Sequence, residues 1–269
     1  AFSAALATYG FGILLVFGGF LFIPQYLQLV LGLSPLEAGL WTLPWALAFV
    51  VGSNVTPVIA RRVRPAYLMA FGLVVAAIGF AVFTQIDGNS GFTAILIGSV
   101  LFSLGTSPLF TLTNDLIIGS APQERAGAAA GLSETSAEFG GALGIAIFGS
   151  IGVAIYRGAM VDAVPSGVPV RAADAARDTL GGALEVASNL SDALGPTLID
   201  TARNAFMQGL HVAAAISVVG ALALAGFVLA LLQRARTGTE TYEHPADNAD
   251  VVATPEGVGA QFPDPVVAE

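Results

Sequence analysis

The sequence has 269 residues, of which 55% are hydrophobic and only 11% are charged, and its formal net charge is −9. Soluble domains carry about 25% charged residues, so the composition excludes an ordinary soluble protein and indicates an integral membrane protein. The acidic charge argues against nucleic-acid binding, and the absence of cysteine excludes disulfide and thiol chemistry. All basic residues are Arg, which with the many Ala, Gly and Val residues is typical of a GC-rich bacterial genome.

Six segments are long and apolar enough to cross a bilayer. A crossing helix needs about 20 mostly apolar residues, and its backbone must be hydrogen-bonded internally because lipid offers no partners. The expected spans are residues 4–30, 35–60, 66–86, 92–119, 128–156 and 208–232. Short connections rich in Gly, Ser, Asn and Pro separate several of them.

Arginine residues gather in alternate connections between these spans. They are Arg61, Arg62 and Arg64 after the second span, Arg125 after the fourth, and Arg234 and Arg236 after the sixth. The positive-inside rule therefore places these connections and both ends of the chain in the cytoplasm. We expect a multi-pass protein of the bacterial plasma (inner) membrane.

The long connection at residues 157–207 is expected to be external. Ala, Leu and Val recur at helical spacing over residues 170–194, interrupted by Gly181 and Gly182, which predicts an external helical hairpin. Pro196 can open a helix that runs into the last span. The alternative is a solvated, partly ordered loop.

The most informative residues are two acids in the fifth span, Glu134 and Glu138. Their spacing puts both carboxylates on one helix face, and a charge near the bilayer centre costs about 2.5–3.5 kcal/mol. At about 1.5 Å per residue, Glu138 lies near mid-membrane and Glu134 closer to the cytoplasm. Burial and mutual repulsion favour the protonated acid, so the pair is predicted to bind a proton or a cation. The alternative is that one acid is structural and hydrogen-bonded to a neighbouring helix.

A third acid, Asp115, ends the polar run of residues 111–115 near the cytoplasmic end of the fourth span. It is a candidate proton or cation site at the inner mouth. The alternative is an interfacial residue exposed to headgroups and water. His211 is expected to open the sixth span as an interface residue rather than a proton relay.

Polar and aromatic residues in the first two spans are candidates for a substrate pathway. Pro24 predicts a kink, and polar side chains beside it either face a cavity or pack between helices. Aromatic rings could stack on a flat cation, although membrane-interface anchoring explains Trp41 as well. The pathway candidates are Gln25, Tyr26, Gln28, Phe17, Phe20, Trp41 and Trp45.

Glycine pairs in the fifth span predict close helix packing. Gly127 and Gly131, and likewise Gly140 and Gly144, are spaced four residues apart, which lets helix backbones approach; a role in flexibility is the alternative. No nucleophile–base pair, metal-ligand cluster or nucleotide loop is evident, so we expect no enzyme, no cofactor and no metal site.

Two stretches resemble the major facilitator superfamily. They are residues 22–44, FIPQYLQLVLGLSPLEAGLWTLP, and residues 121–127, APQERAG, followed by Glu134, Glu138 and Gly140–Gly141. In detail they resemble the fourteen-span drug:proton antiporters, the multidrug and quaternary-ammonium exporters. The connection at residues 52–65 keeps its Arg cluster but lacks the Asp of the family's loop pattern, which leaves topology as the role of Arg61, Arg62 and Arg64.

The resemblance implies an all-α membrane protein in which residues 1–235 form the C-terminal six-helix bundle, built from two inverted three-helix repeats. It also implies a missing N-terminal half, and a cavity lined by the first, second, fourth and fifth spans. The external loop at residues 157–207 belongs to the bundle. Residues 236–269, rich in Pro and acids, are predicted to be a disordered acidic cytoplasmic tail.

The expected function is proton-coupled antiport that exports hydrophobic, cationic drugs or antiseptics across the plasma membrane. The expected partners are the small-molecule substrate, protons, the lipid bilayer and the missing half of the transporter. One alternative is an exporter of an endogenous metabolite, antibiotic or amino acid. Another is a scaffold or inactive fragment when the chain is separated from that half.

Overall fold

The computed structural model describes residues 2–87, 91–191 and 193–237. Six helical segments in this part of the chain are long and apolar enough to cross a membrane, in agreement with the six predicted spans. Their bounds are Phe2–Val30, Pro35–Ala60, Pro65–Phe83, Gly91–Gly119, Gln123–Met160 and Leu194–Leu231. The predicted acidic tail lies outside the described residues from position 238 onward.

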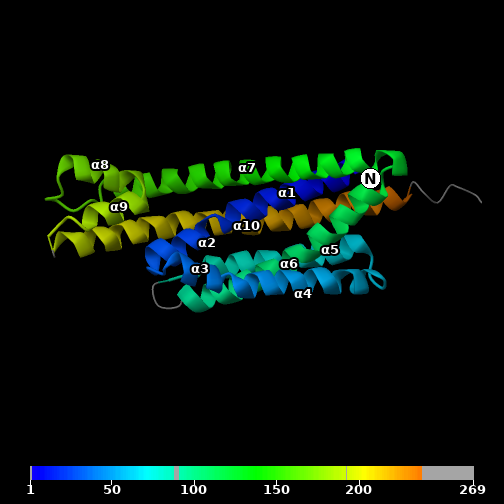
Figure 1. The fold of residues 1–269 in the computed structure, drawn as a ribbon, viewed down its shortest axis with the longest axis horizontal. Helices are drawn as coiled ribbons and strands as arrows, with labels where there is room; N and C mark the ends of the chain where they lie inside the picture. The colour runs from blue at the N-terminus through cyan, green and yellow to red at the C-terminus, as the bar shows by residue number, and fades with distance from the viewer. Residues whose placement is uncertain (1, 88–90, 192, 238–269) are drawn as a thin grey trace, which may run out of the picture.

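The described residues form helices and turns only, which confirms the all-α fold class. The helices are α1 (Phe2–Phe20), α2 (Phe22–Gln25), a π-helix η1 (Tyr26–Val30), α3 (Pro35–Trp41), α4 (Leu43–Ala60), α5 (Pro65–Phe83), α6 (Gly91–Gly119), a 3-10 helix η2 (Gln123–Arg125), α7 (Ala126–Met160), α8 (Val170–Asp178), α9 (Leu180–Ala187) and α10 (Leu194–Thr237). The long helices run side by side, with α8 and α9 at one end, the hairpin end, and the start of α1 and the end of α10 at the other, the terminal end (Figure 1).

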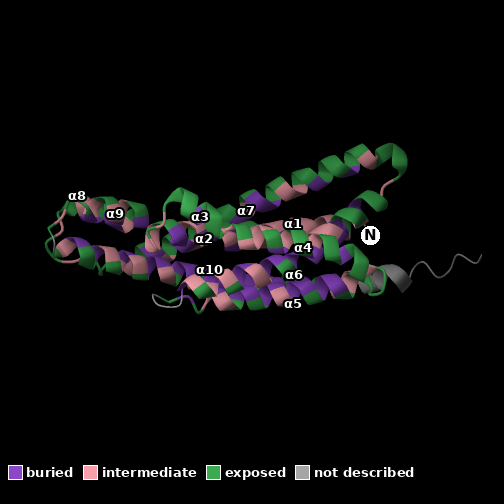
Figure 2. Cartoon of the chain, turned by 60° about the horizontal axis from the view of Figure 1, so that its bottom comes forward, coloured by how far each residue is buried: buried purple, intermediate pink, exposed green. Residues whose placement is uncertain are grey.

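Within the bundle, α4 and α7 lie on opposite sides (Figure 1). Between them α1 packs against α7, α6 and α10, while α6 packs against α4 and α5. The third and sixth spans, α5 and α10, pack against each other. Only a small part of α4 is buried, whereas more than half of α5 and α6 is buried (Figure 2).

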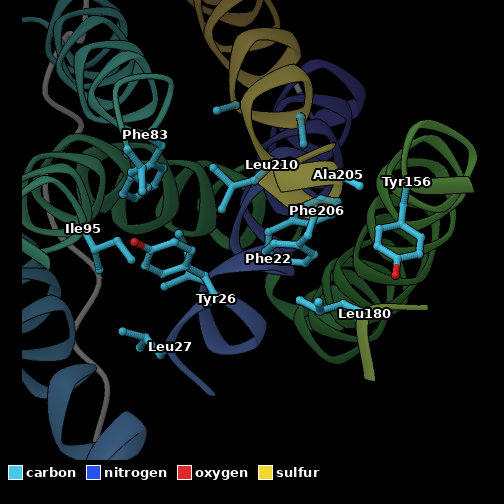
Figure 3. Packing of buried hydrophobic residues seen from close by; sticks show 14 of the residues in the cluster. Phe22, Tyr26, Leu27, Phe83, Ile95, Tyr156, Leu180, Ala205, Phe206 and Leu210 are labelled. Carbon is cyan, nitrogen blue, oxygen red and sulfur yellow. The ribbon is translucent and has the colours of Figure 1, made fainter. Parts of the chain in front are cut away.

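The main hydrophobic core lies toward the hairpin end. Phe22 and Tyr26 of the first span meet Phe83 of α5 and Phe206 and Leu210 of α10, all almost fully buried (Figure 3). A second core, nearer the terminal end, joins α5, α6 and α10. It contains Met69, Leu73, Leu109, Leu224 and Val228 among others.

The helices α5 and α6 approach each other backbone to backbone at two glycines. A Cβ on Gly105 of α6 would overlap the backbone of Ala76 in α5, and a Cβ on Gly79 would lie 2.5 Å from the amide nitrogen of Phe102. In a bilayer, such close van der Waals packing replaces the hydrophobic effect as the force that joins helices. The α5–α6 contact is therefore a tight seam of the bundle.

The glycine predictions for α7 separate into one success and one failure. Gly140 and Gly144 lie on the α1 backbone, where added side chains would overlap the carbonyl groups of Gly10 and Leu14, and this confirms the predicted close packing. Gly127 and Gly131 have nothing within 4 Å of an added Cβ. The packing prediction is therefore wrong for Gly127 and Gly131, because the side of α7 on which they lie is open.

The first span is interrupted at Leu21, one turn before Pro24, because proline cannot donate a hydrogen bond to the preceding turn. The chain then widens into the π-helix, in which Leu31 donates its N–H to the Tyr26 carbonyl at 3.0 Å. A capping box follows: the Glu37 carboxylate accepts from the Ser34 N–H at 2.9 Å, and the Ser34 hydroxyl accepts from the Glu37 N–H at 3.3 Å. Glu37 thus helps to start α3.

The hairpin before the last span is confirmed, but its boundaries differ from the prediction. The helix α7 continues to Met160, and α10 is one continuous helix from Leu194, so both enter the expected loop at residues 157–207. The break falls at Thr179, whose backbone is extended and whose hydroxyl accepts from the Gly182 N–H at 3.1 Å. His211 does not open the sixth span; it lies well inside α10, with Nε2 2.8 Å from the Ile86 carbonyl oxygen.

Candidate functional site

Glu134 and Glu138 lie on the open side of α7, one turn apart, and both are exposed. Their neighbours on this side are apolar: Phe139 is 65% exposed and Ile145 is 45% exposed. Figure 2 shows the same half of α7 as a largely exposed helix at the edge of the bundle. Two acids thus stand on a mainly apolar surface of a helix long enough to cross a membrane.

The opposite side of α7 fixes the direction of the two glutamates. Ser136 lies between them in sequence and donates its hydroxyl to the Leu6 carbonyl of α1 at 3.3 Å. Gly140 continues this contact one turn later, against Gly10. Because α7 is held to α1 through this face, both glutamates point away from the contact.

Neither glutamate nor Asp115 makes a hydrogen bond or an ion pair with any other described residue. Within the described part of the chain, neither glutamate is therefore a structural residue hydrogen-bonded to a neighbouring helix. Tyr9 of α1 lies within electrostatic range of the Glu134 carboxylate. Asp115 is exposed near the end of α6, toward the terminal end of the bundle.

The three predicted acids therefore share one end of the bundle but come from two spans, α6 and α7. A carboxylate free of protein partners can hold either a proton or an organic cation. No group of three His, Asp or Glu side chains placed to hold a metal ion occurs among the described residues.

The polar residues of the first span lie at the hairpin end, away from these acids. Gln25 donates its amide to the Leu21 carbonyl at 3.0 Å and borders a cavity of about 210 Å³ beneath the hairpin, with Tyr156 opposite. Tyr26 is 1% exposed and borders a second cavity, of about 390 Å³, with Asp87, Asp200 and Arg203. Gln28 is exposed. The structure thus brings Gln25 and Tyr26 to two different cavities rather than to one path.

The predicted aromatic residues make specific ring contacts. Phe20 stacks on Trp45 with ring centroids 5.0 Å apart, and Trp41 meets Phe92 edge to face. Trp45 is also held through its carbonyl, which accepts a hydrogen bond of 2.7 Å from the Ser103 hydroxyl. Phe17 is 47% exposed, and its ring lies against the Gly141 position, one turn after Glu138.

Sequence reasoning missed three aromatic residues that are joined by ring contacts. Phe110 of α6 contacts both Phe49 of α4 and Tyr9 of α1. The signal for Phe49 was present, since it follows Trp41 and Trp45 at intervals of four residues. Nothing in the sequence pattern could pair Phe110 with Tyr9, which is distant along the chain.

The arginines of the turns after α4 and α6 are exposed at the terminal end. Arg61, Arg62 and Arg64 occupy the turn between α4 and α5, and Arg125 closes η2. Arg64 also precedes Pro65, the first residue of α5, so this turn has a structural role as a helix start.

The six long apolar helices define a multi-pass membrane protein. A family model described as Major Facilitator Superfamily matches residues 1–145. The chain therefore belongs to the major facilitator superfamily, a family of transporters rather than enzymes.

The chain is also similar to three proteins whose names refer to efflux, export or resistance. It is 39% identical over 84% of its length to the multidrug efflux pump LfrA of Mycolicibacterium smegmatis. It is 31% identical over 81% to the tetracenomycin C resistance and export protein of Streptomyces glaucescens, and 27% identical over 83% to the methyl viologen resistance protein SmvA of Salmonella typhimurium. The matches cover 45%, 41% and 43% of these relatives, so the chain spans less than half of their length.

Proposed function

We propose that this chain is the C-terminal half of a proton-coupled antiporter that exports hydrophobic, cationic compounds across a bacterial inner membrane. The observation that carries the proposal is the pair of partner-free glutamates, Glu134 and Glu138, on the apolar open side of α7. The printed names of the relatives, a multidrug efflux pump and a methyl viologen resistance protein, support drug export. Methyl viologen is itself a flat organic cation.

The orientation in this proposal follows from the arginines. Arg61, Arg62, Arg64 and Arg125 gather at the terminal end, which is then cytoplasmic by the positive-inside rule. The hairpin end is then external. Asp115 and Glu134 lie toward the cytoplasmic mouth, where a substrate from the cytoplasm or inner leaflet would arrive.

Exchange follows from the cost of leaving carboxylates unpaired in a medium of low polarity. Two unneutralised carboxylates one turn apart repel each other and are poorly solvated. Either a proton on a carboxyl oxygen or an organic cation beside it removes that cost. A proton arriving from outside therefore displaces the cation, and a cation arriving from inside displaces the proton, so the two fluxes are coupled at one site.

The direct test is Glu138→Gln, and separately Glu134→Gln, in the full-length transporter that contains this half. Proton-driven efflux of a cationic dye should fall to the background rate in Glu138→Gln, because the amide cannot exchange a proton. Glu185→Gln is the matched control, since this glutamate is exposed on α9 of the hairpin. Unchanged efflux in Glu138→Gln would remove Glu138 from the mechanism.

A second candidate is export of a compound made by the same organism. The relative named a tetracenomycin C resistance and export protein favours this reading, as does one named a cephamycin export protein. Competition of dye efflux by neutral and anionic natural products would separate the two candidates. Inhibition only by cations supports the first candidate, and inhibition by a neutral antibiotic supports the second.

The isolated 269-residue chain is predicted not to transport. Its open side, which includes α7, lacks a facing wall within the described residues, and a substrate site between two halves needs both. Reconstitution of the chain in liposomes, with the full-length protein as the positive control, tests this. Transport by the isolated chain would contradict the two-half site, whereas its absence leaves the chain one part of a larger transporter.

A further inference from the structure

The turn between α4 and α5 concentrates positive charge at the terminal end of the bundle (Figure 1). Arg61, Arg62 and Arg64 lie within four consecutive residues, and all three are exposed. We call residues 61–64 the arginine turn. Like charges at this spacing repel one another, so the arginine turn favours an anionic neighbour that neutralises it.

The described part of the chain supplies no such neighbour. No Asp or Glu occurs between Glu37 and Asp87, so α4, α5 and the arginine turn carry no carboxylate. No ion pair joins any of the three arginines to a described acid. Asp115 stands at the same end of the bundle on α6, but it is exposed and makes no ion pair with a described residue either. The neutralising anion therefore has to come from outside the described residues.

The depth of the arginine turn in the membrane follows from the length of α5. This helix has 19 residues, which is about 28 Å at about 1.5 Å per residue, and the hydrocarbon core of a bilayer is about 30 Å thick. A helix that just crosses the hydrocarbon begins and ends at the headgroups. The arginine turn directly precedes α5, so it lies at the level of the phospholipid phosphates.

An apolar strip leads from the arginine turn toward the middle of the membrane. It consists of Tyr67, Phe71, Val74 and Ile78, which recur at helical spacing along one side of α5 and are 46%, 67%, 41% and 52% exposed. From its first to its last residue the strip covers about 16 Å of helix, close to half of the hydrocarbon thickness. The strip is therefore as long as one leaflet is thick, which is the length that an acyl chain covers.

A second source of positive charge lies beside the start of α5. The helix α10 packs against α5, and Leu68 and Met69 of α5 share a buried core with Val228 of α10. Past this contact α10 continues to the terminal end, with Arg234 and Arg236 in its last turns. Two neighbouring elements therefore bring arginines to the same end of the bundle.

We propose that the arginine turn and the apolar strip bind one anionic phospholipid of the cytoplasmic leaflet. Its phosphate lies on the arginines, because a guanidinium group donates two parallel hydrogen bonds to a phosphate, and an acyl chain lies along the strip. The positive-inside rule explains why arginines stay in the cytoplasm, but it requires neither the absence of acids nor an apolar strip of leaflet length. The lipid site does not depend on which compound is exported.

The test measures the lipid retained by the full-length transporter purified in mixed micelles. The micelles contain equal amounts of phosphatidylglycerol and phosphatidylcholine with identical acyl chains, and mass spectrometry counts both lipids. Each arginine beside an anionic lipid surface contributes about fivefold, so phosphatidylglycerol should be retained in at least about fivefold excess. Arg61→Gln, Arg62→Gln and Arg64→Gln combined should lower that excess at least about fivefold. Arg171→Gln, on the exposed surface of α8, is the matched control and should leave it unchanged.

Free inorganic phosphate at constant ionic strength distinguishes a lipid site from a general anion site. It has no acyl chain, so it should not displace the retained phosphatidylglycerol. Displacement by inorganic phosphate, or an unchanged lipid excess in the combined variant, would overturn the lipid site. The second result would assign the arginines to an acid outside the described residues.

A second measurement leaves the arginines intact and therefore covers the case in which the combined variant misfolds. Phe71→Cys, in a full-length transporter without other cysteines, carries a fluorophore that brominated lipids quench on contact. Brominated phosphatidylglycerol should quench it at least about twofold more than brominated phosphatidylcholine, given the charge preference of the site. Val219→Cys is the control, since Val219 is 67% exposed on α10 outside the strip, and both lipids should quench its label equally. Equal quenching at Phe71→Cys would refute the lipid site, and intact proton-driven efflux in the same protein would leave the proposed function standing.

Discussion

The α5–α6 seam and the open side of α7 use similar residues in opposite ways. In the seam, Gly79 and Gly105 bring two backbones into contact, whereas Gly131 of α7 has nothing within 4 Å. Glu134 and Glu138 share the side of Gly131, while the side that packs on α1 carries Ser136, Gly140 and Gly144. The same residue type therefore lies at a close backbone contact in the seam and on an open surface in the first turns of α7.

The largest expected effect comes from filling the seam. Gly105→Val would force a side chain into the Ala76 backbone, and overpacking of this kind costs about 3 kcal/mol when neither backbone can move. The yield of folded full-length protein and its melting temperature in detergent should both fall. Gly131→Val, the same change on the open side, should leave stability unchanged or raise it by a few tenths of a kcal/mol, because nothing lies within 4 Å of the added Cβ and glycine has the poorer helix propensity. Equal losses of stability in Gly105→Val and Gly131→Val would contradict the distinction between a packed seam and an open side.

A somewhat smaller loss is expected where α7 crosses α1. Gly144→Val would push against the Leu14 carbonyl and should cost about 2 kcal/mol, because single helices can shift apart. The chain has no native cysteine, so a Leu6→Cys and Ser136→Cys pair can report the crossing by disulfide formation. Gly144→Val should lower the cross-linking yield, and Gly127→Val should leave it unchanged. The reverse pattern would contradict the assignment of packed and open sides.

An intermediate effect is expected at the hairpin end, where α7 is tied down by one buried hydrogen bond. Tyr156 is 4% exposed and donates its hydroxyl to the Ala176 carbonyl at 2.8 Å. Tyr156→Phe leaves that carbonyl unpaired and should cost about 1–2 kcal/mol, confined to the hairpin. Limited proteolysis should cut the hairpin faster while the melting temperature of the bundle changes little. A global loss of stability would mean that the hairpin is part of the core.

The smallest effect is expected at the surface ion pair beside it. Arg157 and Asp178 lie 3.0 Å apart, but their side chains are 57% and 65% exposed. Pairs of this kind contribute about 0–1 kcal/mol, so Arg157→Ala should leave the proteolysis rate of the hairpin within twofold of the wild type. If the hairpin is cut as fast in Arg157→Ala as in Tyr156→Phe, the ion pair rather than the buried hydroxyl holds the hairpin.

The spans and the fold class could be predicted because the bilayer requires long apolar segments that can be read directly along the sequence. Apolar length alone identifies a crossing helix, and the i, i+4 rule alone puts Glu134 and Glu138 on one side. The same reasoning placed Pro196 at the start of the last helix.

The remainder depends on contacts that no local pattern encodes. Hydropathy ends where the apolar run ends, but α10 begins at Leu194 because Leu198, Ala202 and Ala205 form a buried stripe among polar residues. The π-helix after Gln25 and the break at Thr179 each reflect local backbone geometry that composition does not announce. The ring partners of Phe110 come from two other spans.

The length of α10 has a practical consequence. It contains 44 residues, which is about 66 Å at 1.5 Å per residue, while the hydrocarbon core of a bilayer is about 30 Å thick. More than half of this rod must therefore stand outside the hydrocarbon, and on one side it carries α9 against it. In electron microscopy, most of a small membrane protein is hidden in its detergent belt. The protruding end of α10 with α9 should be visible outside that belt. It would distinguish the two faces of the protein and help to align particle images without an added antibody fragment.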